Sequence, residues 1–224
     1  FALGDACATA KASREAIDPR YLAATKRAVE FMERHQYARG GWRYTLTSRQ
    51  TGDTSVTGWQ ILALKSAIEA GIEVSPATMQ KVLKFFEDFA VPRTGQTGYA
   101  TRGRGTLLTT AVGLIVQQFI TDKPNPLLIK NAAQVLRGRA AYLGQHGDFY
   151  TLYNATLAMY LTGGDAWTDW NNNVRDAVVK RQVKTGCERG SWYRKYGRTL
   201  DTAWAVLTLE VYYRYATEKE EKDK

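Results

Sequence analysis

Two stretches decide the fold: Gln36-Tyr37-Ala38-Arg39-Gly40-Gly41-Trp42 and, after a polar loop, Asp53-Thr54-Ser55-Val56-Thr57-Gly58-Trp59-Gln60-Ile61-Leu62-Ala63-Leu64. The first is typical of a helix end followed by a glycine turn that carries an aromatic side chain. The second is typical of a capped helix that is apolar on most faces. Weaker copies of this arrangement recur along the chain, so the sequence predicts a repeat of helices.

The bulk composition indicates a soluble globular domain. The 224 residues include 44% hydrophobic residues and only two cysteines, too few for a disulfide framework. No apolar run reaches the roughly 18 residues that a membrane span needs, so we expect no transmembrane segment.

The net charge of +9 favours anionic partners. The basic residues are scattered and match no nucleic-acid-binding module, so nucleic acid is not expected as a partner. The sequence gives no indication of compartment.

One class of predicted helix is amphipathic and starts at a capping residue followed by proline. The starts are Asp18-Pro19, Ser75-Pro76 and Asn125-Pro126, and a fourth helix, over 165–182, has Asp165 as its cap but no proline. Proline suits the first turn because the amide that it lacks would have no intrahelical partner there. Each start is followed by apolar residues at helical spacing, so we expect these helices to cover a core with one face.

The other class of predicted helix is apolar on most faces and has a small residue at its centre. These small residues recur about every 50 residues, a period long enough for two helices and two loops. They are Gly58, Ala111, Ala155 and Ala203. Helices of this kind must be buried, and small residues let neighbouring backbones approach. The sequence therefore predicts an all-α fold in which inner helices alternate with outer ones.

Such alternation forms either an open solenoid or a closed double ring, the α/α toroid. We favour the ring, because the glycine-aromatic turns before the inner helices gather aromatic side chains at one end. We expect residues 1–217 to form one partial ring of about nine helices, followed by a charged tail over 218–224. Residues 2–6 align with 63–67, in the second half of an inner helix. We therefore expect a domain that is truncated at its N-terminus, or a protein partner that completes the ring.

The spacing Gln36-x-x-x-Gly40-x-Trp42 matches the Gln-Trp repeat motif of squalene and oxidosqualene cyclases, and Gln182 with Gly190-Ser191-Trp192 looks like a second copy with an insertion. The chain thus resembles the prenyltransferase and squalene oxidase repeat superfamily, including uncharacterised bacterial members, which fold as α/α toroids. The resemblance implies an isoprenoid as one candidate ligand. Independently of family, the glutamine can bind frayed backbone groups, the glycines permit positive φ, and the tryptophan can tie neighbouring helices together.

The catalytic signatures of the superfamily are absent from the sequence. Class II cyclases use an Asp-x-Asp-Asp cluster, and the chain has none. Protein prenyltransferases bind zinc with an Asp-x-Cys pair and a later histidine, but Cys187 has neither partner. Complement-type thioester domains carry Cys-Gly-Glu-Gln, whereas Cys187 is followed by Glu188-Arg189-Gly190. We therefore expect no catalytic residue, no metal and no cofactor, and a binding or scaffolding role.

The candidate ligand-binding residues lie in the turns before the inner helices or at helix starts. They are Trp42, Tyr44, Asp53, Tyr99, Arg102, Arg104, Tyr150, Tyr153, Trp192, Tyr193, Arg198 and Asp201. If these turns meet at one rim, they form an aromatic cavity with a basic edge that would suit an anionic or isoprenoid ligand. The alternative is that the cations are solvated loop residues and the rings fill the core.

Two enzymatic alternatives stay open. One is an isoprenoid-handling enzyme, cyclase-like or prenyltransferase-like, whose acid lies upstream of Phe1 or is Asp53. The other is a polysaccharide-processing enzyme that uses Asp148 and Asp201 as its carboxylates. Asp53 is more typical of a helix N-cap. Asp201 would need a partner if it were buried, and Arg198 or the amides of an adjacent turn could supply one.

Overall fold

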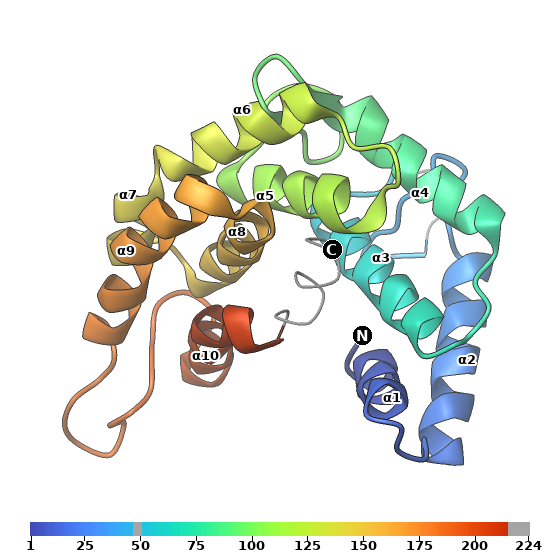
Figure 1. Ribbon diagram of the computed structural model, residues 1–224, viewed down its shortest axis with the longest axis horizontal. Helices are drawn as coiled ribbons and strands as arrows, with labels where there is room; N and C mark the ends of the chain where they lie inside the picture. The colour runs from blue at the N-terminus through green and yellow to red at the C-terminus, as the bar shows by residue number, and fades with distance from the viewer. Residues whose placement is uncertain (47–50, 215–224) are drawn as a thin grey trace. The chain divides into compact units, whose positions relative to one another are not determined.

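Helices dominate the computed structural model, which describes residues 1–46 and 51–214. This part of the chain contains ten α helices, one π-helical turn and two strands of two residues each. The predicted all-α class is therefore confirmed (Figure 1). Within these residues, no helix combines the length and the apolar character that crossing a bilayer would require.

The described residues divide into two compact units. Unit 1 comprises Phe1–Ala90 and Gly98–Gly103, and unit 2 comprises Val91–Thr97 and the chain from Arg104 onward. The two strands, β1 (Ala90–Val91) and β2 (Gln96–Thr97), pair where the chain passes from one unit to the other.

Unit 1 is built around one buried helix. Its helices are α1 (Ala2–Ala12), α2 (Pro19–Arg34), α3 (Thr54–Glu69) and α4 (Pro76–Phe89). Helix α3 contacts the other three (Figure 1). It buries Gly58, Ile61 and Leu64. Helices α2 and α4 are amphipathic and bury one face each, as their apolar spacing predicts.

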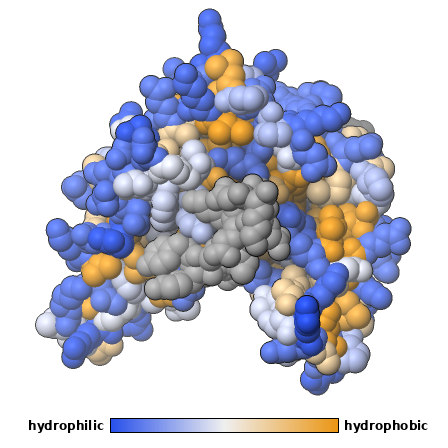
Figure 2. Space-filling view, viewed as in Figure 1, coloured by the Kyte–Doolittle hydropathy of each residue, from blue (hydrophilic) through white to orange (hydrophobic). Residues whose placement is uncertain are grey.

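Unit 2 is built in the same way around α8. Its helices are α5 (Leu107–Ile115), which continues into the π-helical η1 (Val116–Ile120), α6 (Pro126–Arg137), α7 (Ala140–His146), α8 (Phe149–Thr162), α9 (Gly164–Lys180) and α10 (Arg198–Arg214). Helix α8 is buried along almost its whole length because α5, α6, α9 and α10 all contact it. Helix α6 covers the core with Leu128, Ala132 and Leu136 and exposes Lys130 and Arg137. Hydrophilic residues accordingly predominate on the outer surface that Figure 2 shows for this helix.

The predicted helix starts are confirmed where a proline follows the cap. The Asp18 carboxylate accepts a hydrogen bond from the Arg20 amide at 2.8 Å, and the Asn125 side chain accepts one from the Leu128 amide at 3.1 Å. The predicted start of the fourth amphipathic helix, at Asp165, is wrong by one residue. Helix α9 begins at Gly164, and Asp165 lies in its first turn instead of capping it. The reason is Gly163, whose φ of 71° ends α8 and begins α9 with no loop between them.

The burial predicted for the small central residues holds for three of the four. Gly58, Ala111 and Ala155 are buried, whereas Ala203 is exposed. Within unit 2, α10 packs against α8, and Leu200 and Val206 are exposed together with Ala203. The prediction for Ala203 is therefore wrong, because the described residues cover only one side of this apolar helix.

Candidate functional site

The Gln-Trp motif of unit 1 ties the end of α2 to α3 and α4. The Gln36 side-chain amide donates to the carbonyl oxygens of Gly40 and Thr78, both at 3.0 Å. The buried Trp42 ring donates from Nε1 to the carbonyl of Met32 at 2.9 Å. The Trp42 backbone amide donates to Oγ1 of Thr57 in α3 at 3.0 Å. We call the set Gln36, Gly40, Trp42 and Thr57 the unit-1 clamp.

Unit 2 contains three of these four bonds, without a counterpart of the bond to Thr78 among the described residues, and we call the set Gln182, Gly190, Trp192 and Thr202 the unit-2 clamp. The Gln182 side chain donates to the Gly190 carbonyl at 2.9 Å. The Trp192 ring, also buried, donates to the Val178 carbonyl at 2.8 Å, and its backbone amide donates to Oγ1 of Thr202 at 3.0 Å. The two segments, which the sequence analysis paired, therefore share these three hydrogen bonds. Both tryptophans hold their own unit together.

Asp53 caps α3 in unit 1. Its Oδ1 accepts from the Val56 amide at 2.9 Å and from the Ser55 hydroxyl at 2.7 Å. The predicted capping role is confirmed. Its Oδ2 is fully buried, and within the described residues it has no hydrogen-bond partner. Among the described residues, Arg43 forms an ion pair with this carboxylate, and its Nε lies 3.8 Å from Oδ2, too far for a hydrogen bond.

Tyr99 lies beside this carboxylate with its side chain partly exposed. Burial raises the pKa of the Tyr99 phenol above its ordinary value, and the negative charges of Asp53 and of an ionised Tyr44 raise this pKa further. Tyr99 is 43% exposed and Tyr44 is 85% exposed. Of the sequence-predicted residues, the structure thus brings Asp53 and Tyr99 together. Tyr44 and Arg102 lie in the same unit, and Arg102 is exposed in the same short segment as Tyr99.

A pocket of about 790 Å³ lies within unit 2 between the start of α5, the turn from α7 to α8, and the segment before α10. We call it the unit-2 pocket. Its aromatic and ionisable lining consists of Tyr142, His146, Asp148, Arg194, Lys195 and Tyr196. Leu107, Leu108 and Leu143 supply an apolar part of the wall. One pocket therefore combines cationic side chains, tyrosines and leucines.

Asp201 holds the basic wall of this pocket in place. The carboxylate is fully buried, and its Oδ2 accepts from the backbone amides of Arg194 at 2.7 Å and Tyr196 at 3.1 Å. The turn amides expected as its partner are therefore found. The other expected partner, Arg198, instead donates to Glu188 at 3.0 Å. Asp201 thus fixes the backbone that carries Arg194, Lys195 and Tyr196.

Arg181, which the sequence analysis did not single out, holds the opposite wall. Its guanidinium donates to the carbonyls of Gly144 at 3.1 Å and Gly147 at 2.8 Å, and it lies 4.0 Å from the centroid of the Phe149 ring. Desolvation lowers the pKa of this guanidinium, and the positive charge of Arg194 lowers the pKa further. An arginine remains charged in spite of such a shift. The carboxylates of Asp201 and Asp148 act in the opposite direction and raise the pKa of Arg181.

The carboxylates of this region are engaged in structural bonds. Asp148 caps α8, and its two oxygens accept from the backbone amide and the hydroxyl of Thr151, both at 2.9 Å. Asp201 is inaccessible to solvent. General acid and base catalysis needs a carboxyl group within hydrogen-bond reach of substrate. Asp201 does not present one, whereas Asp148 lines the unit-2 pocket with both of its oxygens bonded to Thr151.

The remaining sequence-predicted residues of unit 2 divide between core and surface. Tyr153 is buried with its ring 5.3 Å from that of Trp204, and Tyr150 lies between Trp204 at 5.2 Å and Tyr196 at 6.2 Å. Tyr193 is 69% exposed, and Arg104 and Arg198 are also exposed. Tyr150 thus contacts Tyr196 of the pocket lining through its ring.

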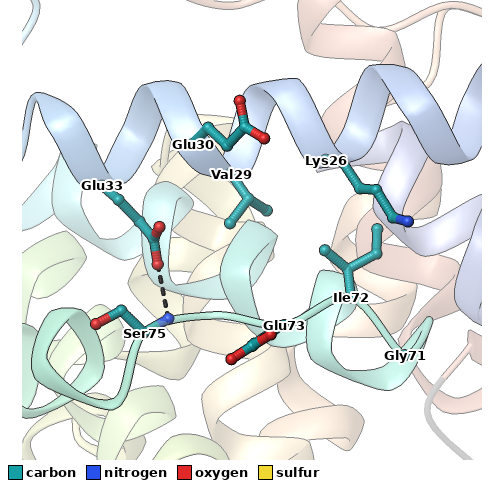
Figure 3. Close-up of a pocket in the computed structure, with 8 residues that line it drawn as sticks. All are labelled: Lys26, Val29, Glu30, Glu33, Gly71, Ile72, Glu73 and Ser75. Atoms are coloured by element: carbon teal, nitrogen blue, oxygen red, sulfur yellow. Dashed lines mark hydrogen bonds between the residues drawn. The ribbon is translucent and has the colours of Figure 1, made fainter.

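Unit 1 has a hollow of about 550 Å³ between α2 and the connection from α3 to α4, and it is acidic (Figure 3). The Glu33 carboxylate accepts from the Ser75 amide at 2.7 Å and so holds this connection against α2. Figure 3 shows the Glu30 carboxylate directed away from the connection, so it does not converge with Glu33. Among the residues that the structure describes, no group of three or more histidine, cysteine or acidic side chains is placed to hold a metal ion.

Asp201→Ala is expected to lower the free energy of unfolding by about 2 to 3 kcal/mol, because two amides lose a charged acceptor. The same substitution should speed hydrogen exchange at the amides of Arg194 and Tyr196 by about tenfold or more. Denaturant titration and amide exchange measure the two effects. Asp176→Ala is the matched control, because Asp176 is an exposed partner of Arg175 and such a pair contributes about 0.5 kcal/mol. Unchanged exchange at both amides would contradict the role assigned to Asp201.

Comparison of the chain with protein-family models, with curated proteins and with solved structures finds no match.

Proposed function

We propose that the chain is a non-catalytic binding module of the α/α toroid type and that its unit-2 pocket binds an anionic ligand with an apolar skeleton. One observation carries the proposal. The buried Asp201 fixes the backbone of residues 194–196 at the pocket edge, and these residues present a guanidinium group, an ammonium group and a phenol ring. A site held in place before the ligand arrives loses less conformational entropy on binding.

The lining chemistry supports this class of ligand. Arg194 can bind a carboxylate or a phosphate through two parallel hydrogen bonds, and Lys195 adds a second positive charge. The neighbouring Arg181 adds to the positive potential, and an anion would offset its repulsion of Arg194. The leucines of α5 and the ring of Tyr142 offer apolar contact to the remainder of the ligand.

The resemblance of the clamps to the Gln-Trp motif selects the first ligand to test. An isoprenoid diphosphate has two phosphates for Arg194 and Lys195 and a hydrocarbon chain for Leu107 and Leu108. Binding without turnover is proposed because the carboxylates of the pocket, Asp148 and Asp201, already serve in helix capping and loop anchoring. The alternative is an isoprenoid-handling enzyme that uses Asp53 as its acid, and the test must distinguish this enzyme from a module that only binds.

Isothermal titration of the protein with farnesyl diphosphate tests the proposal. We expect binding that is at least about tenfold weaker for Arg194→Ala, because one charge-assisted hydrogen bond contributes about 1.5 kcal/mol or more. Lys130→Ala is the matched control, since Lys130 is an exposed cation on α6, and its affinity should be unchanged. Farnesol and inorganic pyrophosphate, each carrying half of the ligand, should both bind more weakly than the whole molecule.

Three outcomes would overturn the proposal. Equal affinity for farnesol and farnesyl diphosphate would show that Arg194 and Lys195 do not bind the phosphates. Absence of binding by the wild-type protein would show that isoprenoid diphosphates are not the ligand. Product formation during incubation would favour the enzymatic alternative, and loss of that product in Asp53→Asn would assign the acid.

A further inference from the structure

The lining of the unit-2 pocket carries charges of both signs. Arg194 and Lys195 bring cationic side chains from the segment before α10, and Asp148 brings a carboxylate from the start of α8. None of these three side chains forms an ion pair with another residue that the structure describes. The pocket therefore offers an anion-binding group and a cation-binding group that do not neutralise each other by direct contact.

Asp148 can accept further hydrogen bonds while it caps α8. Its two oxygens each accept one bond, from the amide and the hydroxyl of Thr151, both at 2.9 Å. An ionised carboxylate has about four acceptor positions, so each oxygen has room for another donor. The residue is half-buried, in contrast to the fully buried Asp201. Asp148 is thus accessible to a ligand in the pocket.

The charge of Asp148 also acts on the cationic side of the pocket. The hydrogen bond to Tyr196 and the charge of an ionised Tyr196 raise the pKa of Lys195, and the Asp148 carboxylate raises this pKa further. A ligand with negative charge alone would be attracted by Lys195 and repelled by Asp148. A ligand with an ammonium group next to its anionic group would be attracted by both.

We propose that the ligand of the unit-2 pocket is a phosphodiester amphiphile whose head group carries an ammonium group. The inference rests on the proposed function and deepens it by naming the group that Asp148 binds. Arg194 and Lys195 bind the phosphate, and Asp148 accepts a hydrogen bond from the ammonium group. The leucines of α5 contact the hydrocarbon chain, and the volume of about 790 Å³ is sufficient for a ligand of this size.

Isothermal titration with two phosphodiesters of equal chain length tests the inference. Octyl phosphoethanolamine carries the ammonium group, ethyl octyl phosphate lacks it, and both are used below their critical micelle concentrations. The wild-type protein should bind the first at least about tenfold more tightly, because of one charge-assisted hydrogen bond. Asp148→Asn should abolish this preference and keep the fold, which circular dichroism verifies, because asparagine caps a helix about as well as aspartate. Arg194→Ala should weaken the binding of both ligands by about tenfold or more.

Two controls accompany this measurement. Asp176→Asn removes an exposed carboxylate of α9 that pairs with Arg175, and this variant should keep the preference. Glycerophosphoethanolamine has the same head group without a hydrocarbon chain, and it should bind more weakly than octyl phosphoethanolamine. Equal affinity for these two compounds would overturn the assignment of an amphiphile.

The outcomes distinguish this inference from the proposed function. Equal wild-type affinity for octyl phosphoethanolamine and ethyl octyl phosphate, with both weakened by Arg194→Ala, overturns the role of Asp148 and leaves the proposed function standing. A preference that persists in Asp148→Asn also overturns that role. Absence of binding by the wild-type protein to either phosphodiester and to farnesyl diphosphate overturns both proposals.

Discussion

Trp192→Ala is expected to lower the free energy of unfolding by about 3 to 5 kcal/mol, the usual cost of removing a large buried ring. The ring is buried between α9 and α10, and its Nε1 donates to the Val178 carbonyl at 2.8 Å. Truncation removes the packing and one of the hydrogen bonds that this carbonyl accepts, while the Arg181 amide still donates to it at 3.1 Å. Trp42→Ala should have an effect of the same size in unit 1, where the corresponding acceptor is Met32. Denaturant unfolding followed by circular dichroism measures both.

Trp192→Phe is the control that separates packing from hydrogen bonding. It keeps most of the buried ring and removes only the Nε1 donor, so a loss of about 1 to 3 kcal/mol is expected. If Trp192→Ala cost less than about 1 kcal/mol, the clamp would not be a main source of stability in unit 2.

Gly40→Ala is expected to be far more destabilising than Gly190→Ala, although the two glycines hold the same place in their clamps. Both have left-handed backbones, with φ of 90° at Gly40 and 87° at Gly190, so each alanine brings a strain of about 1 kcal/mol. A Cβ at Gly40 would overlap the carbonyl oxygen of Lys81 in α4, whereas a Cβ at Gly190 meets no atom within 4 Å. We expect about 3 kcal/mol or more for Gly40→Ala, because backbone must move to admit the methyl group.

The difference between the two losses of unfolding free energy isolates the overlap with Lys81, because backbone strain is common to both variants. A similar loss of about 1 kcal/mol in each variant would show that α4 can shift away from Gly40 at little cost. A large loss in both would show that the turn at Gly190 is constrained by more than its φ. Thermal and denaturant unfolding of the pair under identical conditions decides between these results.

Much of the fold follows from local sequence signals. Proline after a capping residue marks the starts of α2, α4 and α6, because the chemistry that begins these helices lies within four residues of the start. Burial depends on packing between distant segments. Ala203 is exposed, and its helix is less apolar than those of Gly58 and Ala155, but the sequence of the helix does not show which of its faces is left uncovered.

Two elements escaped prediction for different reasons. Helix α7 has seven residues, too few to show a helical period in the sequence. The π-helical η1 continues α5 without a change of composition, because Val116 and Phe119 would suit an ordinary helix equally well. In both cases the surrounding packing, and not local propensity, determines the backbone.

The role of a candidate-site residue was predictable where its hydrogen-bond partners lie within a few residues of it in the sequence. Asp53 caps the helix that it precedes, and that role can be read from the sequence. The bonds from Asp201 back to the amides of Arg194 and Tyr196 cross a turn whose path depends on the clamp. Arg181 has no local signal at all, because its acceptors, Gly144 and Gly147, lie more than thirty residues earlier in the chain.

The two clamps keep the same bonds across connections of different length. The step from the accepting carbonyl to the tryptophan spans ten residues from Met32 to Trp42 and fourteen from Val178 to Trp192. Lengthening a surface connection carries only a small entropic penalty. The connection between Gln182 and Gly190 is therefore a natural place to graft a peptide epitope or a fluorescent reporter, since both of its anchors already tolerate four additional residues.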